Sequence, residues 1–173
     1  TIHLLANGVE VDTKTVTEKD DWTYSFTDLP KYQEGVLIHY TVTENHVPDY
    51  STTIDGMDIY NRYTPGKTSV NVTKSWDDQN DQDGLRPTKI NVQLYGNGKK
   101  IGEPISLSAD NQWTHTWLDL DEKENGETIA YTIKEISETK EYEESVEDDD
   151  QGNILLTNTH KPETTQISGK KTW

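Results

Sequence analysis

The chain has 173 residues, with 16 Lys and Arg against 32 Asp and Glu, and its formal net charge is −16. This charge argues against nucleic acid as a partner, because phosphates are bound by basic patches. Hydrophobic residues make up 30% of the chain, and no run approaches the roughly 18 apolar residues of a membrane span. No signal peptide opens the chain and cysteine is absent, so we expect no membrane segment, no disulfides and small cores that rely on Trp and Tyr.

The two halves of the chain repeat each other. Residues 22–44 align without gaps on residues 113–135, at an offset of 91 (113 minus 22). Residues 60–64 match residues 157–161, and residues 72–76 match residues 169–173, both at an offset of 97 (158 minus 61). The chain is therefore a tandem repeat.

Connectors rich in Thr, Pro and Gly separate the repeats and suggest domain boundaries near Gly66 and Glu163. This gives one domain over 1–66, a second over 67–163, and a final segment over 164–173. Thr1 aligns near Asn91, so the first domain lacks its opening strand and the loop after it. The final segment has the sequence of such an opening strand. Both deliberate permutation and ragged trimming of a longer protein are open explanations of these ends.

Short alternating runs separated by turn residues predict an all-β sandwich in each repeat. Residues 90–95, followed by Gly96-Asn97-Gly98, indicate a hairpin. The clearest strands are expected over 36–44 and 129–135. The acidic stretch 143–150 is interpreted as a solvated loop, and no segment has sustained helical periodicity.

Polar side chains occur on the apolar faces of three predicted strands in the second repeat. Lys74 shares a face with Val70, Val72 and Trp76. Glu135 and Asn158 likewise end the apolar faces of residues 129–135 and 154–158. In the first repeat the equivalent residues are Glu44 and Asn61, and the lysine that matches Lys74 is Lys171 in the final segment.

Two interpretations of these residues are open. One is a buried Lys–Glu ion pair with the Asn hydrogen-bonded to both, because buried charges are normally paired. In the other, burial lowers the pKa of the lysine and raises that of the glutamate, so that both become neutral. A neutral amine beside a carboxamide is a nucleophile next to an electrophile, and a neutral Glu can polarise the amide and pass a proton to the departing ammonia. The product would be a Lys–Asn isopeptide bond.

Several motifs together resemble the Cna B-type repeats, which are stalk modules of Gram-positive collagen adhesins and related surface proteins. They are Lys74-Ser75-Trp76-Asp77-Asp78, the stretch from Asn80 to Pro87, the pattern Tyr-Thr-[Val/Ile]-x-Glu, and Asn-x-[Tyr/His] near the end of each repeat. The resemblance implies tandem inverse-immunoglobulin-like sandwiches. It also implies an autocatalytic Lys–Asn bond between the first and last strands, assisted by a glutamate. These residues are Lys74, Asn158 and Glu135 in one set and Lys171, Asn61 and Glu44 in the other.

The second set is expected to form between molecules. In the family fold the first and last strands run parallel, so the chain leaves a domain at the pole opposite its start. Eight residues lie between Asn158 and Ile167 and span at most about 28 Å, which is too short to return past the whole second domain. We therefore expect the final segment to complete the first domain of a neighbouring copy by strand addition.

The expected function is that of a structural stalk module of an adhesin on the cell wall of a Gram-positive bacterium, outside the cell. Alternatives are a module that binds collagen, mucin or another matrix protein, and an engineered self-polymerising building block. We expect no enzymatic turnover, because the amine and the amide are both consumed. No cofactor is implied, and neither the acidic turn near Gly84 nor the five histidines have metal-ligand spacing.

Overall fold

The computed structural model describes residues 1–137 and 139–173, which form an all-β structure. The only helical segments among these residues are two short 3₁₀ turns, at Glu18–Asp20 and Ala109–Asn111. No helix in this part of the chain is long and apolar enough to cross a membrane. The strands of the first half are β1 (Ile2–Ala6), β2 (Val9–Lys14), β3 (Tyr32–Gln33), β4 (Val36–Leu37), β5 (Tyr40–Glu44), β6 (Tyr50–Asp55) and β7 (Asp58–Tyr63). Those of the second half are β8 (Lys67–Asp77), β9 (Lys89–Gly96), β10 (Lys99–Ser108), β11 (Thr114–Asp121), β12 (Lys123–Glu124), β13 (Glu127–Thr128), β14 (Tyr131–Glu135), β15 (Glu143–Asp148) and β16 (Asn153–Thr159).

The second half, domain 2, is a sandwich of two sheets ordered β11-β8-β16-β15 and β10-β9-β14. The central strands β8 and β16 run parallel, as the family resemblance implies, and pair Ile154 with Val72 and Leu156 with Lys74. The inward faces of both sheets enclose one apolar core, formed by Val70, Val72, Ile90, Val92, Leu94, Leu107, Ile133, Ile154 and Leu156. Lys74 therefore lies at the end of a continuous apolar face.

The first half, domain 1, repeats part of this plan with a smaller core. Its sheets are β2-β1-β5, β6-β7 and the short pair β3-β4, and Ile2, Leu4 and Val42 form the buried centre. Residues 23–30 align with β11 but form no regular strand. In domain 2, β11 is hydrogen-bonded to β8, whereas no strand of the described part of the chain takes the place of β8 beside residues 23–30. An open groove of about 790 Å³ lies there, between residues 22–29 and the face of β7.

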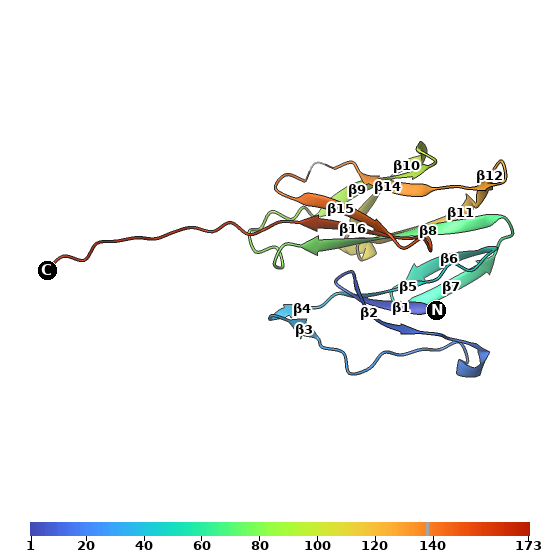
Figure 1. Ribbon diagram of the computed structural model, residues 1–173, viewed down its shortest axis with the longest axis horizontal. Coiled ribbons are helices and arrows are strands. Elements are labelled where there is room, and N and C mark those ends of the chain that lie inside the picture. The colour runs from blue at the N-terminus through green and yellow to red at the C-terminus, as the bar shows by residue number, and fades with distance from the viewer. Residues whose placement is uncertain (138) are drawn as a thin grey trace.

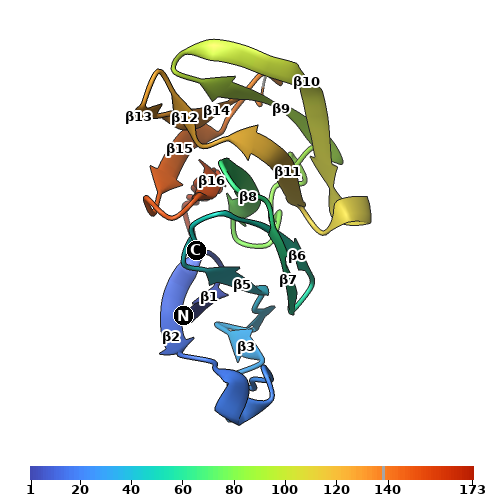
Figure 2. The same ribbon diagram turned by 90° about the vertical axis from the view of Figure 1, so that its right-hand side faces the viewer.

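The two domains lie side by side (Figures 1 and 2). Figure 1 shows β7 running towards the turn after Tyr63 and β8 running back from it, so the chain reverses direction between the domains. The chain consequently leaves domain 2 at the end away from that turn, where a strand parallel to β7 would also start. The final segment therefore does not have to return past the whole second domain to reach its own first domain, contrary to the sequence-based expectation. The family fold determines at which ends the chain enters and leaves each domain, but it does not determine the angle between the two domains.

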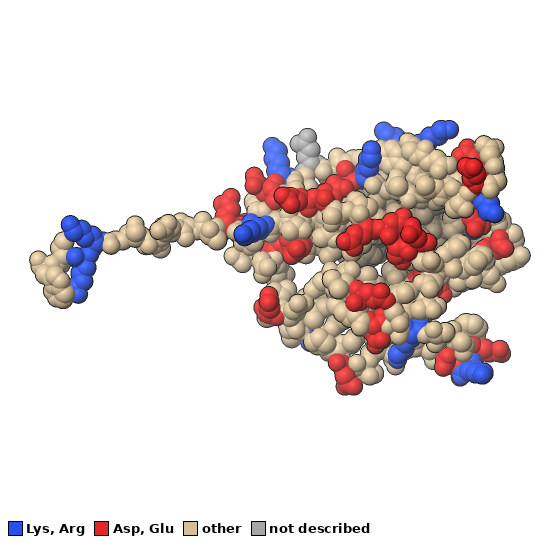
Figure 3. Space-filling model, in the orientation of Figure 1, with Lys and Arg blue, Asp and Glu red and all other residues tan. Residues whose placement is uncertain are grey.

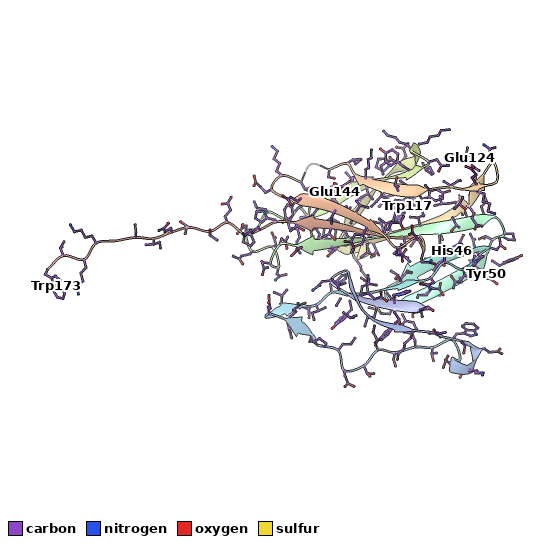
Figure 4. All side chains as sticks on the ribbon, in the orientation of Figure 1. His46, Tyr50, Trp117, Glu124, Glu144 and Trp173 are labelled. Carbon is purple, nitrogen blue, oxygen red and sulfur yellow. The ribbon has the colours of Figure 1, made fainter. Side chains whose placement is uncertain are left out.

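Residues 160–173 have no secondary structure. His160 and Glu163 are still hydrogen-bonded to Asp83 of domain 2, and the residues after them form a tail that projects away from both domains (Figure 1). Figure 4 shows Trp173 at its far end, and the side chains of Ile167 and Trp173 are fully open to solvent.

Three predictions of local structure need correction. The stretch predicted as an acidic loop contains β15, which pairs with β16 over its whole length. All six residues of β15 are exposed, so the alternation that identifies a half-buried strand is absent, and charged side chains are typical of a sheet edge. The run predicted over 36–44 is divided into β4 and β5, and the run over 129–135 forms a strand only from Tyr131.

Candidate functional site

Strands β8, β16 and β14 place three polar side chains at one end of the domain 2 core. Lys74 is 2% exposed and Asn158 is fully buried, whereas Glu135 at the end of β14 is half-buried. In the parallel ladder Lys74 pairs with Leu156, and the next inward-facing residue of β8, Trp76, pairs with Asn158. Asn158 is therefore the next inward-facing residue of β16 after Leu156, the partner of Lys74, and the Lys74 amine has to extend by only two residues along the ladder to meet its carboxamide.

The Lys74 side chain extends in that direction. Its Nζ lies 3.6 Å from the centre of the Trp76 ring and donates a hydrogen bond to the Ser75 carbonyl oxygen at 2.9 Å. Burial lowers the pKa of Lys74 to about 7, because the charged form is poorly solvated. A substantial fraction of this amine is neutral, and therefore nucleophilic, near neutral pH.

The acid and the carboxamide contact each other directly. Asn158 Nδ2 donates to Glu135 Oε1 at 3.3 Å. Burial raises the pKa of Glu135, and this outweighs the opposite effects of the Asn158 hydrogen bond and the Lys74 charge. Glu135 Oε2 and Asn158 Oδ1 are buried and have no hydrogen-bond partner among the residues that the structure describes. Unpartnered buried oxygens are costly, and an acidic proton or an amine between them would remove that cost.

The contacts of a buried ion pair are not found at this site. None of the ion pairs among the described residues involves Lys74. No hydrogen bond joins its amine to Glu135 or Asn158, although the negative charge of Glu135 is close enough to act on the pKa of Lys74. The Asn158 carboxamide is thus hydrogen-bonded to the Glu135 carboxyl, while the Lys74 amine makes no direct contact with that carboxyl.

A polar cluster that the sequence reasoning did not identify closes the domain over this site. Asp78 is 2% exposed and accepts hydrogen bonds from Arg86 Nε at 3.0 Å, Arg86 Nη2 at 2.5 Å and the Tyr142 hydroxyl at 2.8 Å. Tyr142 also packs edge-on against Trp76, at 5.2 Å between ring centres. Asp78 could have been found, because it continues the two-residue period of Lys74 and Trp76. Arg86 and Tyr142 come from distant segments and gave no such signal.

The corresponding site of domain 1 is incomplete. Asn61 Nδ2 donates to both carboxylate oxygens of Glu44, at 3.0 and 2.9 Å, so the acid and the carboxamide are again paired. Asn61 is exposed along the groove, whereas Asn158 is buried. Lys171 lies on the tail, with its amine 3.7 Å from the centre of the Trp173 ring, and is not brought to Glu44 or Asn61.

Acidic side chains outnumber basic ones on the face of the molecule drawn in Figure 3. Figure 3 shows acidic side chains over both domains, while the lysines of the tail lie apart from them. In the ranges 1–137 and 139–173 no group of His, Cys, Asp or Glu side chains is arranged to hold a metal ion.

A sandwich with this pair of parallel central strands, next to a partial copy of the same plan, defines a class of repeat, and comparison with known proteins identifies it. The family model of the Cna protein B-type domain matches residues 1–62 and 70–159, and the chain belongs to this family. The chain is 54% identical over 172 residues to a collagen adhesin of Staphylococcus aureus. That match covers 99% of the chain and 14% of the relative, so the chain spans only a small part of that protein's length.

Solved structures agree with this assignment. A single B repeat unit of the collagen-binding surface protein of S. aureus is 52% identical, with a TM-score of 0.86 over 93% of this chain and 86% of that one. A structure of two B repeat units gives the same identity and TM-score over 92% of this chain and 43% of that one. The chain is therefore similar to one B repeat unit.

Proposed function

We propose that this chain is a stalk segment of a bacterial surface adhesin, in which Lys74 and Asn158 join through an isopeptide bond assisted by Glu135. The observation that carries the proposal is the burial of an amine of lowered pKa and a carboxyl of raised pKa around one carboxamide. The relationship to a staphylococcal collagen adhesin supports a position outside the cell, on the surface of a Gram-positive bacterium. The division into domains 1–66 and 67–163 and a strand at 164–173 is part of this proposal.

The reaction needs no external reagent. The neutral Nζ of Lys74 attacks the side-chain carbonyl carbon of Asn158, and the nitrogen of the tetrahedral intermediate gives a proton to the Glu135–Asn158 pair. The bond from that carbon to Nδ2 then breaks, and Nδ2 leaves as ammonia with the proton passed on by Glu135. One amide replaces another, so the mass falls by one ammonia molecule. Because the amine and carboxamide are consumed, the reaction occurs once per site and the protein is not an enzyme.

The bond would suit a stalk for a mechanical reason. It ties the first strand of domain 2 to the last, closing a loop of about 85 residues that adds about 4–5 kcal/mol of stability by the chain-entropy relation for cross-links. A pulling force that enters along β8 and leaves along β16 would pass through the bond without unfolding the sandwich.

Intact-mass spectrometry of the denatured chain tests this proposal. We expect a mass lower than the sequence mass by one ammonia molecule, and a peptide in which Lys74 and Asn158 are joined after digestion. Lys74→Ala and Glu135→Gln should both retain the full sequence mass. A wild-type chain of unchanged mass would refute the covalent proposal and leave a non-covalent stalk domain.

We further propose that the groove of domain 1 takes up the segment 167–173 of a neighbouring copy. Three features support this: the groove lies where domain 2 holds β8, the paired Glu44 and Asn61 line it, and the tail repeats the pattern of β8. By the register of β8 and β16, Lys171 would pair with Ile59 and Trp173 with Asn61. The same groove can be filled by the preceding repeat in a longer protein.

Denaturing electrophoresis and hydrogen exchange test this strand addition. We expect covalent multimers that survive boiling, that disappear with Lys171→Ala, and that persist with the neighbouring change Lys170→Ala. Residues 23–30 should gain exchange protection, because they acquire a hydrogen-bonded partner. A monomer that has lost two ammonia molecules would instead mean that the tail folds back into its own domain 1, which the arrangement of the domains permits.

Binding to collagen or another matrix protein is not assigned to this chain. The relative is named as a collagen adhesin as a whole, and this chain matches 14% of it. We propose that any contact with host matrix is made by other regions of such a protein.

A further inference from the structure

A threonine hydroxyl contacts both members of the Glu–Asn pair in each domain. In domain 2, Thr139 Oγ1 donates to Glu135 Oε1 at 3.2 Å and accepts from Asn158 Nδ2 at 3.2 Å. In domain 1, Thr52 Oγ1 donates to Asn61 Oδ1 at 2.5 Å and lies 3.5 Å from Glu44 Oε2. The function proposed above uses neither hydroxyl.

The two threonines do not occupy equivalent positions in the repeat. Thr52 lies on β6 and pairs with Asn61 in the β6–β7 ladder. The residue that pairs with Asn158 in the corresponding ladder is Glu144, whereas Thr139 comes from the segment between β14 and β15. If the hydroxyl were only inherited with the repeated sequence, it would occupy the same position in both domains. Two different elements instead supply a hydroxyl to the same Glu–Asn pair, which indicates that the site requires one.

We propose that Thr139 is a positioning residue for isopeptide formation, which holds the Asn158 carboxamide with its nitrogen against the Glu135 carboxyl. This inference rests on the proposed function. A hydroxyl has one proton to donate, and Thr139 donates it to Glu135. Its contact with Asn158 must therefore be made to an N–H, which places Nδ2 rather than Oδ1 beside the carboxyl.

This orientation matters because Nδ2 is the leaving group. When Lys74 Nζ forms its bond to the side-chain carbon of Asn158, the electron pair of the breaking carbon–nitrogen bond goes to Nδ2. The proton that completes ammonia comes from the lysine nitrogen by way of Glu135, which lies 3.3 Å from Nδ2. A carboxamide turned by half a rotation would present its oxygen to the carboxyl and leave the nitrogen without a proton donor. Reactions that depend on such alignment are slowed strongly by small displacements.

Timed mass spectrometry of newly made protein tests the role of Thr139. The full chain is synthesised in a cell-free system and stopped in acid at intervals, and the fraction that has lost ammonia is followed by intact mass. We expect Thr139→Val to slow the loss about tenfold or more, and Thr139→Ser, which keeps the hydroxyl, to remain near the wild-type rate. Thr116→Val is the matched control, because it removes a hydroxyl bond of the same 3.2 Å length, to Asn71, outside the site.

The pH dependence of the rate separates positioning from packing. The Thr139 hydrogen bond opposes the rise in the pKa of Glu135 caused by burial. Thr139→Val should therefore raise the pKa of Glu135 further. Because the reaction uses the protonated carboxyl, the pH above which the rate falls should move upwards in Thr139→Val and stay unchanged in Thr116→Val. Wild-type rates in Thr139→Val, or slow rates in Thr139→Ser as well as in Thr139→Val, would overturn the assignment. If the wild-type chain never loses ammonia, the proposed function itself fails.

Discussion

Among single residues, the buried His160 joins two loops by hydrogen bonds at the end of domain 2 that holds the candidate site. Its Nδ1 lies 2.7 Å from the Glu141 carbonyl oxygen and its Nε2 lies 2.7 Å from Asp83 Oδ2. Only the protonated ring can donate both bonds, because neutral imidazole has a single N–H. The hydrogen bonds to Asp83 and to the Glu141 carbonyl raise the pKa of His160, and the bond from His160 lowers the pKa of Asp83.

These shifts fix the sign of a pH effect. A raised folded-state pKa stabilises the protein fully below the unfolded value, about 6.5 for histidine, and this contribution is lost as the pH rises through the folded value. We expect the thermal midpoint of the wild-type chain to fall between about pH 6 and pH 9 by more than that of His160→Gln. His115→Gln is a control of opposite sign, because burial lowers the pKa of His115. Parallel pH curves for the wild type and His160→Gln would contradict the prediction.

At the scale of elements, the β9–β10 hairpin depends on two residues with left-handed backbone. Asn97 has φ 47° and Gly98 has φ 79°, the combination that a two-residue turn needs to match the twist of its strands. No other atom lies within 4 Å of the place where a side chain on Gly98 would start. Backbone conformation alone therefore limits this position to glycine.

The cost of replacing Gly98 can be measured without steric complications. Gly98→Ala should lower the free energy of unfolding of domain 2 by about 1 kcal/mol, because alanine is strained at this φ. Denaturant titration of the two proteins measures the difference. Gly169→Ala is matched to it, since that site also has open space but no positive φ, and it should leave the stability unchanged.

At the scale of the whole molecule, polar contacts hold the two domains side by side. The Thr52 amide donates to Ser69 Oγ at 2.8 Å, the His46 amide donates to Gln151 Oε1 at 3.0 Å, and Asn153 Nδ2 donates to the Glu44 carbonyl oxygen at 3.0 Å. Such contacts are directional, so they fix an angle rather than supply a large attraction.

Loss of two of these contacts should loosen the arrangement. We expect the double variant Ser69→Ala and Gln151→Ala to increase the radius of gyration in small-angle scattering while the strand content stays unchanged. Arg62→Ala is the comparison, because the Arg62–Asp119 ion pair also joins the domains but is exposed and contributes little. An unchanged radius in the double variant would mean that other contacts set the angle.

The repeat, the all-β class and the inward face shared by Lys74 and Trp76 could be predicted from the sequence, because alternation and internal repetition are local properties. The parallel first and last strands were implied by the family resemblance. The sequence also singled out Lys74, Glu135 and Asn158. In the structure Glu135 and Asn158 are hydrogen-bonded to each other, and the Lys74 amine lies over the neighbouring Trp76 ring. The edge strand β15 was missed, since both its faces are solvated and no hydrophobic alternation marks it.

Features that depend on distant segments meeting in space could not be predicted from the sequence. The reversal between the domains follows from interdomain hydrogen bonds whose partners are far apart in the sequence, such as Asn153 and Glu44. The Asp78–Arg86–Tyr142 cluster and the hydroxyls of Thr139 and Thr52 likewise come from segments that meet only when the sheets close. Residues 23–30 illustrate the same limit, because a strand needs a hydrogen-bonded neighbour as well as a suitable sequence.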